Sequence, residues 1–339
     1  MKALRYLNKY FLKYKYRLLI GLFITFISRF LALEVPQLIS QSIDIADDYN
    51  NGIITDIALV KSDLLDNILL IIGAALLSGF FTFLMRQTII VTSRLIEFDL
   101  KNEIYQQYQR LSLNFYKKNR TGDLMNRISE DVTKVRMYFG PAIMYTMNML
   151  VLFIVAIIKM YDIDSTLTNY TLLPLPLLSV SIYLLSRVIN KRSTIVQQYL
   201  SKLTANAQET FSGISILKSY GIEYKAIAEF EELSNTSKEK NIDLFKAQAL
   251  FFPLMILLIG LSNILVIYVG GLRYMAGEIS LGVIAEFIMY VNMLTWPVAV
   301  VGWVTSLVQQ AEASQERINE FLKHKPEIVN ISEEPAKIE

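Results

Sequence analysis

Apolar and polar positions follow one another in long blocks along this chain. Six blocks are almost wholly apolar and cover residues 18–40, 67–92, 137–158, 166–189, 249–270 and 281–308. A bilayer core about 30 Å thick needs ~20 helical residues to cross it, and each block reaches that length. Helices buried inside soluble proteins rarely stay uncharged for so long. The pattern therefore predicts an all-α membrane protein with six transmembrane helices.

A second pattern fills the long polar segments 93–136 and 190–248, where apolar residues recur every three or four positions. This spacing is typical of amphipathic helices. The first stripe is Ile96, Leu100, Ile104, Tyr108, Leu111 and Phe115, then, after Gly122, Leu124, Ile128, Val132, Val135 and Phe139; the second is Ile195, Tyr199, Leu203, Ala207, Phe211, Ile214 and Leu217, interrupted at Gly221.

We therefore predict that each polar segment is a helical hairpin that extends two membrane helices by ~30 Å, at ~1.5 Å per residue. The turns are expected near residues 114–122 and 220–225. Such hairpins fit either contact with a partner outside the membrane or a solvated extension without a partner.

Charge assigns the two sides of the membrane. If the polar segments alternate between sides, one side holds 28 of the 33 lysines and arginines. The basic side of a membrane protein is the cytoplasmic one, so both termini and both hairpins are predicted to be cytoplasmic. The outer segment 41–66 is acidic. The block 18–40 is too long for the apolar core of a signal peptide, so no cleavable signal is expected.

Composition and motifs exclude several kinds of site. The chain has no cysteine, one histidine and a net charge of +2, which argues against disulfides, thiolate metal sites and a nucleic-acid surface. His324 is expected to be solvated. The nearest string to the phosphate loop G-x-x-x-x-G-K-S/T is "GISILKS" at residues 213–219, which lacks the second glycine and falls on a predicted helix. We expect no metal, cofactor or enzymatic chemistry in this chain.

Polar residues inside the apolar blocks are candidates for a substrate cavity. A charge at the centre of a membrane helix costs roughly 2.5–3.5 kcal/mol on insertion scales and normally faces protein or water. Arg29, Glu34 and Glu286 are therefore expected to line a central cavity, where Arg29 pairs with a carboxylate or meets an anionic group of the substrate. A structural ion pair between helices is the alternative. The weaker candidates, which could equally bond neighbouring helices, are Asn148, Asn292 and Trp296.

Several segments resemble the type I ABC exporters, in the order of that family and over residues 10–325. "FYKKNRTGDLMNRISEDVTKVR" resembles their first intracellular loop, with matches at Phe115, Tyr116, Gly122, Leu124, Arg127 and Asp131. "LEVPQLISQSID", "SGISILKSYGIE" and "QAEASQERINEFL" resemble the end of the first membrane helix, the second intracellular turn and the helix that leaves the membrane. "GEISLGVIAEFIMYVNMLTWPV" resembles the start of the sixth helix, with matches at Gly277, Gly282, Phe287, Tyr290 and Pro297.

The resemblance implies a transmembrane domain over residues 18–325, an amphipathic elbow helix at 1–17, and a linker at 326–339 toward a nucleotide-binding domain. It also implies that a short coupling helix at each hairpin turn lies against such a domain. Coupling helix 1 is predicted at Asn114, Phe115, Tyr116, Lys117, Lys118, Asn119 and Arg120, and coupling helix 2 at Ser219, Tyr220, Gly221, Ile222, Glu223, Tyr224 and Lys225.

The elbow residues are expected to meet the membrane surface. Lys2, Arg5, Lys9 and Lys13 suit anionic lipid heads, and Tyr6, Tyr10 and Phe11 suit the interface.

The function implied by the resemblance is ATP-driven export of an amphiphilic, drug-like or lipid-like substrate by alternating access across a bacterial inner membrane. The implied partners are a second transmembrane subunit, identical or related, nucleotide-binding domains that bind ATP and Mg²⁺, and membrane lipid. We expect those domains to follow on the same polypeptide rather than on a separate chain. A peptide exporter of the same family, or a stand-alone receptor or channel with a non-ATPase partner, is the alternative.

Overall fold

The computed structural model describes residues 3–327, and this part of the chain is helical, with no strand. Six helical stretches are long and apolar enough to cross a membrane, which confirms the six predicted spans. The long helices are α2 (Lys15–Asn50), α3 (Ile57–Arg110), α7 (Ile143–Ile163), α9 (Pro174–Ser212), α11 (Glu223–Ala249), α12 (Phe251–Met275) and α13 (Leu281–Leu322). The short ones are η1 (Ala3–Leu7), α1 (Asn8–Lys13), α4 (Leu113–Lys118), α5 (Thr121–Asn126), η2 (Arg127–Asp131), α6 (Val132–Met137), η3 (Tyr138–Ala142), α8 (Ser165–Leu172) and α10 (Ile214–Tyr220).

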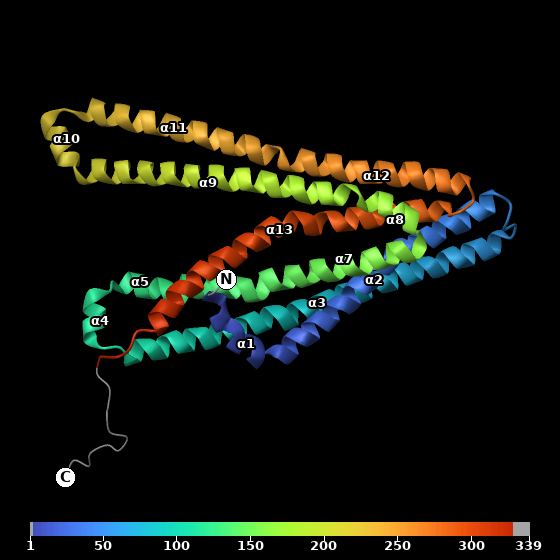
Figure 1. Cartoon of the computed structure of the whole chain (residues 1–339), viewed down its shortest axis with the longest axis horizontal. Coiled ribbons are helices and arrows are strands. Elements are labelled where there is room, and N and C mark those ends of the chain that lie inside the picture. The colour runs from blue at the N-terminus through green and yellow to red at the C-terminus, as the bar shows by residue number, and fades with distance from the viewer. Residues whose placement is uncertain (1–2, 328–339) are drawn as a thin grey trace, which may run out of the picture. The chain divides into compact units, whose positions relative to one another are not determined.

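The helices form two compact units. Unit 1 comprises Met1–Ser165 and Ala276–Glu339, and unit 2 comprises Thr166–Met275. In each unit a short helix crosses at the turn: α4 lies between α3 and α5 in unit 1, and α10 lies between α9 and α11 in unit 2 (Figure 1). Each unit therefore contains one of the two predicted hairpins.

Helix α3 illustrates how one continuous helix serves both the membrane and the hairpin. Asp56 caps its first turn by accepting a hydrogen bond from the backbone N–H of Ala58 at 2.8 Å. With 54 residues it is about 80 Å long. Large apolar side chains such as Leu69 and Leu76 are exposed along its membrane part, whereas Leu100 in the hairpin part is fully buried. The helix thus changes from a lipid-facing rod to a packed element.

The apolar stripe of the first hairpin forms a core that we call the hairpin core. Its buried members come from both helical arms of the hairpin, from the N-terminal segment and from the end of α13. They are Leu4, Leu7, Tyr10, Ile96, Leu100, Ile104, Leu111, Val132, Val135, Phe139, Ala311, Ile318 and Phe321. Every stripe position from Ile96 to Phe139 is buried or packs against this core. The predicted amphipathic face is therefore confirmed, and the structure adds what covers it.

The elbow lies against α3 as well as against the hairpin core, which corrects the prediction for its polar side chains. Lys9 pairs with Glu103 and Lys13 with Asp99, both at 2.6 Å, instead of being free for lipid heads. Tyr10 is buried and donates to Glu103 at 2.7 Å. Two carboxylates of α3 therefore hold the elbow. Lys2 lies outside the described residues.

The outer ends of α2 and α13 approach so closely that only glycine fits between them. A Cβ at Gly282 would lie 2.1 Å from the carbonyl oxygen of Ser40. Asp44 accepts hydrogen bonds from the backbone N–H of Gly282 and the hydroxyl of Ser280, each at 2.7 Å. A side chain of α2 thus satisfies donors at the start of α13. This contact explains why α2 needs an acceptor at Asp44 and α13 needs a residue without a side chain at Gly282.

The second hairpin has a different environment. Helices α9 and α11 run side by side and α10 joins them (Figure 1). The stripe positions Tyr199 and Leu203 are half-buried, whereas Phe211 and Ile214 near the turn are exposed. The helical prediction for this segment is confirmed, but its apolar face is open in the described chain.

Candidate functional site

Helix α4 carries the predicted coupling helix 1. Residues 114–118 lie on it, Asn119 ends it, and Arg120 follows in extended backbone. The ring of Phe115 packs 6.1 Å from that of Phe321 on α13, measured between centroids. The Tyr116 hydroxyl donates to the carbonyl of Tyr108 on α3. One side of α4 is therefore anchored on two long helices.

The segment that follows α13 is bonded to the same turn. The Asn114 amide and the Ser112 hydroxyl each donate to Glu327 at 3.0 Å, and the Gln107 amide donates to the His324 carbonyl at 2.6 Å. His324 is exposed, and its ring contacts Phe115 at 5.4 Å. The predicted linker begins here, and its residues 328–339 lie outside the described part of the chain. The route out of α13 is thus tied to α4.

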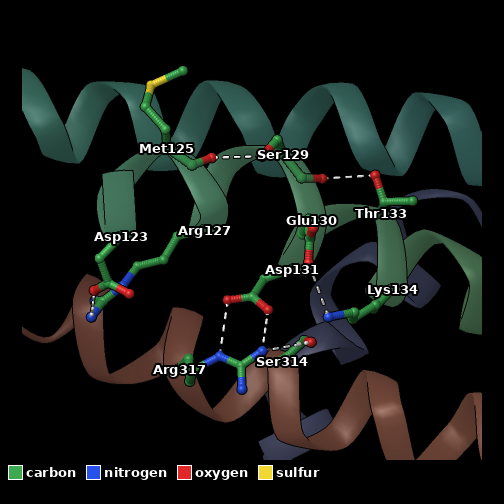
Figure 2. A network of polar contacts seen from close by, with 10 residues as sticks. All are labelled: Asp123, Met125, Arg127, Ser129, Glu130, Asp131, Thr133, Lys134, Ser314 and Arg317. Carbon is green, nitrogen blue, oxygen red and sulfur yellow. Dashed lines mark hydrogen bonds and ion pairs between the residues drawn. The ribbon is translucent and has the colours of Figure 1, made fainter. Parts of the chain in front are cut away.

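A half-buried ion pair joins this hairpin to α13. Figure 2 shows Asp131 pointing from η2 toward Arg317 on α13. The Nε atom of Arg317 lies 3.0 Å from Asp131 Oδ2. The Nη2 atom of Arg317 donates to Asp131 Oδ1 and to the Ser314 hydroxyl. Asp131 is 4% exposed. Two parallel bonds from one guanidinium fix both distance and angle between the elements. Sequence reasoning found Asp131 but missed Arg317, because nothing in the segment around Arg317 indicates which helix it faces.

The second turn differs from its prediction. Only Ser219 and Tyr220 of the predicted coupling helix 2 lie on the transverse helix α10, which begins at Ile214. Gly221 and Ile222 form the turn, and residues 223–225 begin α11. Gly221 has a φ of 62° and ends α10, as glycine commonly does, but Gly213 already ends α9. The predicted coupling helix 2 began at Ser219, five residues after α10 begins, because only Gly221 and not Gly213 was taken as a helix end.

The string "GISILKS" does not fit a nucleotide phosphate. Gly213 precedes α10, and the other six residues lie on that helix rather than in a glycine-rich loop after a strand. The described residues of this chain therefore offer no phosphate cradle at this string.

Two pockets in unit 1 separate the charged residues that were predicted to share one cavity. The first, which we call the Lys159 pocket, has a volume of about 550 Å³ and is lined by Lys159, Glu286 and Tyr290 among others. Lys159 Nζ lies 2.7 Å from Glu34 Oε1 and 2.9 Å from Gln37 Oε1. Glu286 is 3% exposed and accepts the Tyr290 hydroxyl at 2.7 Å. Both carboxylates are thus bonded within this region.

The second pocket, the Arg29 pocket, has a volume of about 560 Å³ and is lined by Arg29, Arg86, Asn148 and Trp296 among others. Arg29 Nε donates to Asn148 Oδ1 at 3.0 Å. The predicted pairing of Arg29 with a carboxylate is therefore wrong in this structure. Asn292 is exposed and lines neither pocket.

The reason for the separation is helical rotation. Arg29 and Glu34 are five positions apart on α2, which turns them about 140° from each other. The prediction of a shared cavity had relied only on how deep Arg29, Glu34 and Glu286 lie in the membrane. Lys159 was missed because the charge count assigned it to an outer segment, whereas the structure places it on α7, bonded to Glu34.

Comparison with known proteins agrees with this geometry. The family model described as the ABC transporter transmembrane region matches residues 18–298. The chain belongs to this family. As an ABC transporter chain it is an integral membrane protein, and the resemblance drawn from its motifs is confirmed.

Individual relatives cover the chain well but extend beyond it. It is 30% identical over 239 residues to the multidrug resistance-like ATP-binding protein MdlA of Escherichia coli (strain K12), covering 70% of this chain and 40% of that protein. It is 28% identical over 345 residues to the protein of the same name from Buchnera aphidicola subsp. Baizongia pistaciae (strain Bp), covering 100% of this chain and 58% of the relative. The probable multidrug resistance ABC transporter ATP-binding/permease protein YheI of Bacillus subtilis (strain 168) is 28% identical over 239 residues, covering 70% and 41%. The chain thus spans about half the length of these relatives.

Proposed function

We propose that this chain forms the translocation path of an ATP-driven exporter of amphiphilic, drug-like or lipid-like substrates, working as a dimer. Family membership supports the transport role, and the words "multidrug resistance" in the names of several relatives support the substrate class. Nucleotide-binding domains, on the rest of the polypeptide or on a separate chain, supply ATP hydrolysis. This chain contributes the translocation pathway and the helical hairpins that transmit movement to it.

The observation that carries the proposal is the connection between α4 and the Arg29 pocket. Helix α4 is anchored on α3 and α13, and Asp131 ties η2 to α13. The same long helices line the pocket through Arg86 on α3 and Trp296 on α13, while Asn148 on α7 completes the wall. A packed core transmits displacement because it has little free volume. A movement imposed at α4 therefore reaches the pocket walls.

Alternating access follows from this connection. When the nucleotide-binding domains approach each other, they move the hairpin turns, and the long helices tilt with them. The walls of the pocket then separate on one side of the membrane and close on the other. The cytoplasmic side is the one that holds the hairpins, in agreement with the distribution of basic residues.

Helix α10 offers the sharper test, because its side chains are not also part of a core. Tyr220 is 78% exposed. In the complete transporter reconstituted in vesicles, we expect Tyr220→Ala to lower the amount of substrate moved per ATP hydrolysed by about tenfold, the effect of losing one central contact residue. Tyr268→Ala, at a tyrosine that is 65% exposed on α12 of the same unit and away from the hairpin turn, is the control.

If Tyr220→Ala moved as much substrate per ATP hydrolysed as the wild type, this turn would not transmit movement from the nucleotide-binding domains. Substrate movement that needs no nucleotide at all would instead favour the channel alternative. Dansylated amphiphiles of different head-group charge serve as transported probes.

A further inference from the structure

The Arg29 pocket carries two positive charges and no negative one. Arg29 comes from α2 and Arg86 from α3, and among the described residues no aspartate or glutamate lines this pocket. The pocket lies in the apolar blocks of unit 1, where an uncompensated charge is costly. This arrangement needs a physical explanation.

The nearby carboxylates do not neutralise Arg29. In the described structure, the only bond of Arg29 is the one from Nε to the Asn148 amide oxygen. The amide nitrogen of Asn148 donates to the Met144 carbonyl at 3.0 Å, which directs the amide oxygen toward Arg29. Glu34 is bonded to Lys159 and Glu286 to Tyr290. The remaining guanidinium N–H groups of Arg29 therefore have no acceptor in the residues described.

Arg86 adds a second free cation. It is exposed, and between residues 3 and 327 no hydrogen bond or ion pair to it is present. A guanidinium presents a planar set of donors that matches a carboxylate or a phosphate with two parallel bonds. Two such groups facing one pocket suit a single anionic head group.

The rest of the wall is apolar and adaptable. Methionines from three helices, Met85, Met144 and Met293, line the pocket together with Trp296. Methionine is flexible and polarizable, so it adjusts to apolar groups of irregular shape. The pocket volume of about 560 Å³ is in the range of small-molecule sites. The wall therefore suits an apolar tail next to the cationic end.

The Lys159 pocket provides an internal contrast. Its cation is paired with Glu34 at 2.7 Å, and Glu286 also lines it. That pocket has no uncompensated positive charge to offer. The preference for an anion is therefore a property of the Arg29 pocket and not of every polar site in the unit.

We propose that the Arg29 pocket selects amphiphiles with an anionic head group, a carboxylate or a phosphate, and holds the apolar tail against the methionines and Trp296. The proposal rests on the proposed export function and specifies its substrate class. The same head-group chemistry occurs in anionic membrane lipids and in soluble acidic amphiphiles, and the experiment separates the two sources.

The test compares two probes with the same tail, 11-(dansylamino)undecanoic acid, whose head group is anionic, and its methyl ester, whose head group is neutral. Binding is measured by dansyl fluorescence on the complete transporter in phosphatidylcholine nanodiscs. We expect the acid to bind at least about tenfold more tightly than the ester, the size of one charge-assisted interaction. Arg29→Gln should remove this preference by weakening the binding of the acid, and Arg29→Lys should keep part of the preference.

Controls decide whether the effect is local. Lys61→Gln removes a cation from the first turns of α3, away from the Arg29 pocket, and should leave the preference intact. Adding phosphatidylglycerol to the nanodiscs identifies the source: competition with the acid points to a membrane lipid, and no competition points to a soluble amphiphile. Either result supports the anionic site.

The proposal is overturned if the wild-type transporter binds acid and ester equally, or if the preference survives in both Arg29→Gln and Arg86→Gln. ATP-dependent movement of the probes is measured in parallel. Transport without head-group preference would reject this proposal alone, whereas absence of ATP-dependent transport of every probe would count against the proposed function itself.

Discussion

The two hairpins of this chain carry equally regular apolar stripes, but only the first stripe is buried. Ile96, Leu100 and Val132 of the first hairpin are almost inaccessible to solvent. In the second hairpin Phe211 is 74% exposed, and the stripe lines an open groove of about 660 Å³ between α9, α10 and α11. The same helical spacing thus leads to two different environments.

The difference lies in what each hairpin has beside it. The elbow and the last turns of α13 cover the first stripe and close the hairpin core. Within unit 2, the described neighbours of the second hairpin are its own helices α9, α10 and α11, together with α12. An apolar surface of this kind indicates an interaction site. In the proposed dimer, the second stripe is the one available to another subunit, while the first supports its own chain.

A matched pair of leucine truncations would test this contrast most strongly. Leu100→Ala removes a fully buried side chain from the hairpin core and should destabilise the protein by about 2–5 kcal/mol. Leu203→Ala changes a half-buried position of the second stripe and should cost about 1 kcal/mol or less. Thermal unfolding of the purified protein in detergent measures both.

Equal losses of stability in the two variants would break the comparison. That result would mean that the second stripe is covered in the purified protein. Repeating the Leu203→Ala measurement over a range of protein concentrations would then identify a second copy as the cover.

The ion pair between Asp131 and Arg317 gives a smaller effect that isolates the link between the first hairpin and α13. Asp131→Asn leaves the Arg317 guanidinium facing a neutral group. Because Arg317 is itself about half exposed, we expect a loss of about 1–3 kcal/mol, below the value for a fully buried pair. Glu130→Gln, whose carboxylate is exposed and pairs with Lys134 at 3.4 Å, should change stability by less than about 0.5 kcal/mol.

A double-mutant cycle shows whether the loss belongs to the pair. Adding Arg317→Gln to Asp131→Asn should cost less than the sum of the two single changes, because either change alone already removes the bond. Strictly additive losses would indicate that the two residues act separately, and the rigid connection to α13 would have to lie elsewhere.

Hydrophobic spacing was enough to predict the spans and the hairpins, because the length of an apolar block and the period of a stripe are properties of the sequence. It could not predict what covers each stripe. The first stripe is closed by Leu4, Leu7 and Phe321, which lie about 90 to 220 residues from Leu100 along the chain. No local pattern marks these positions as partners of Leu100.

The polar site was harder to predict for the same reason. Arg29, Glu34 and Glu286 were found because charges inside apolar blocks are conspicuous, but their partners depend on helix rotation and packing. Glu34 bonds Lys159 on α7, and Arg29 bonds Asn148, about three turns earlier on the same helix. Likewise Lys9 and Lys13 were assigned to lipid, although Glu103 and Asp99 on α3 bind them. A sequence indicates that a charge needs a partner, and the fold decides which one.

The smallest expected effect concerns the attachment of the elbow to α3, and it can be measured by changing pH. Burial acts to raise the pKa of Glu103, which lies well beyond the apolar block that ends at residue 92, but hydrogen bonds from Lys9, Tyr6 and Tyr10 hold that pKa below its usual value. Burial and the bond to Glu103 raise the pKa of Tyr10, so this tyrosine stays a donor. The contribution of Glu103 is therefore complete above its unfolded pKa of about 4.3 and is lost as pH falls through the lowered folded value.

The chain has no cysteine, so a single spin label reports on the elbow directly. Leu12→Cys places the label on an exposed site of α1. Acidification below about pH 4 should increase its mobility, and Glu103→Gln should make this response smaller, with Asp99 left to hold the elbow through Lys13. A label at Phe211→Cys on the second hairpin should respond much less, because the Lys218–Glu223 pair at that turn is exposed and an exposed ion pair contributes little to stability. If both labels became mobile together, acid would be loosening the whole chain, and the elbow would not be a separately held cover of the first hairpin.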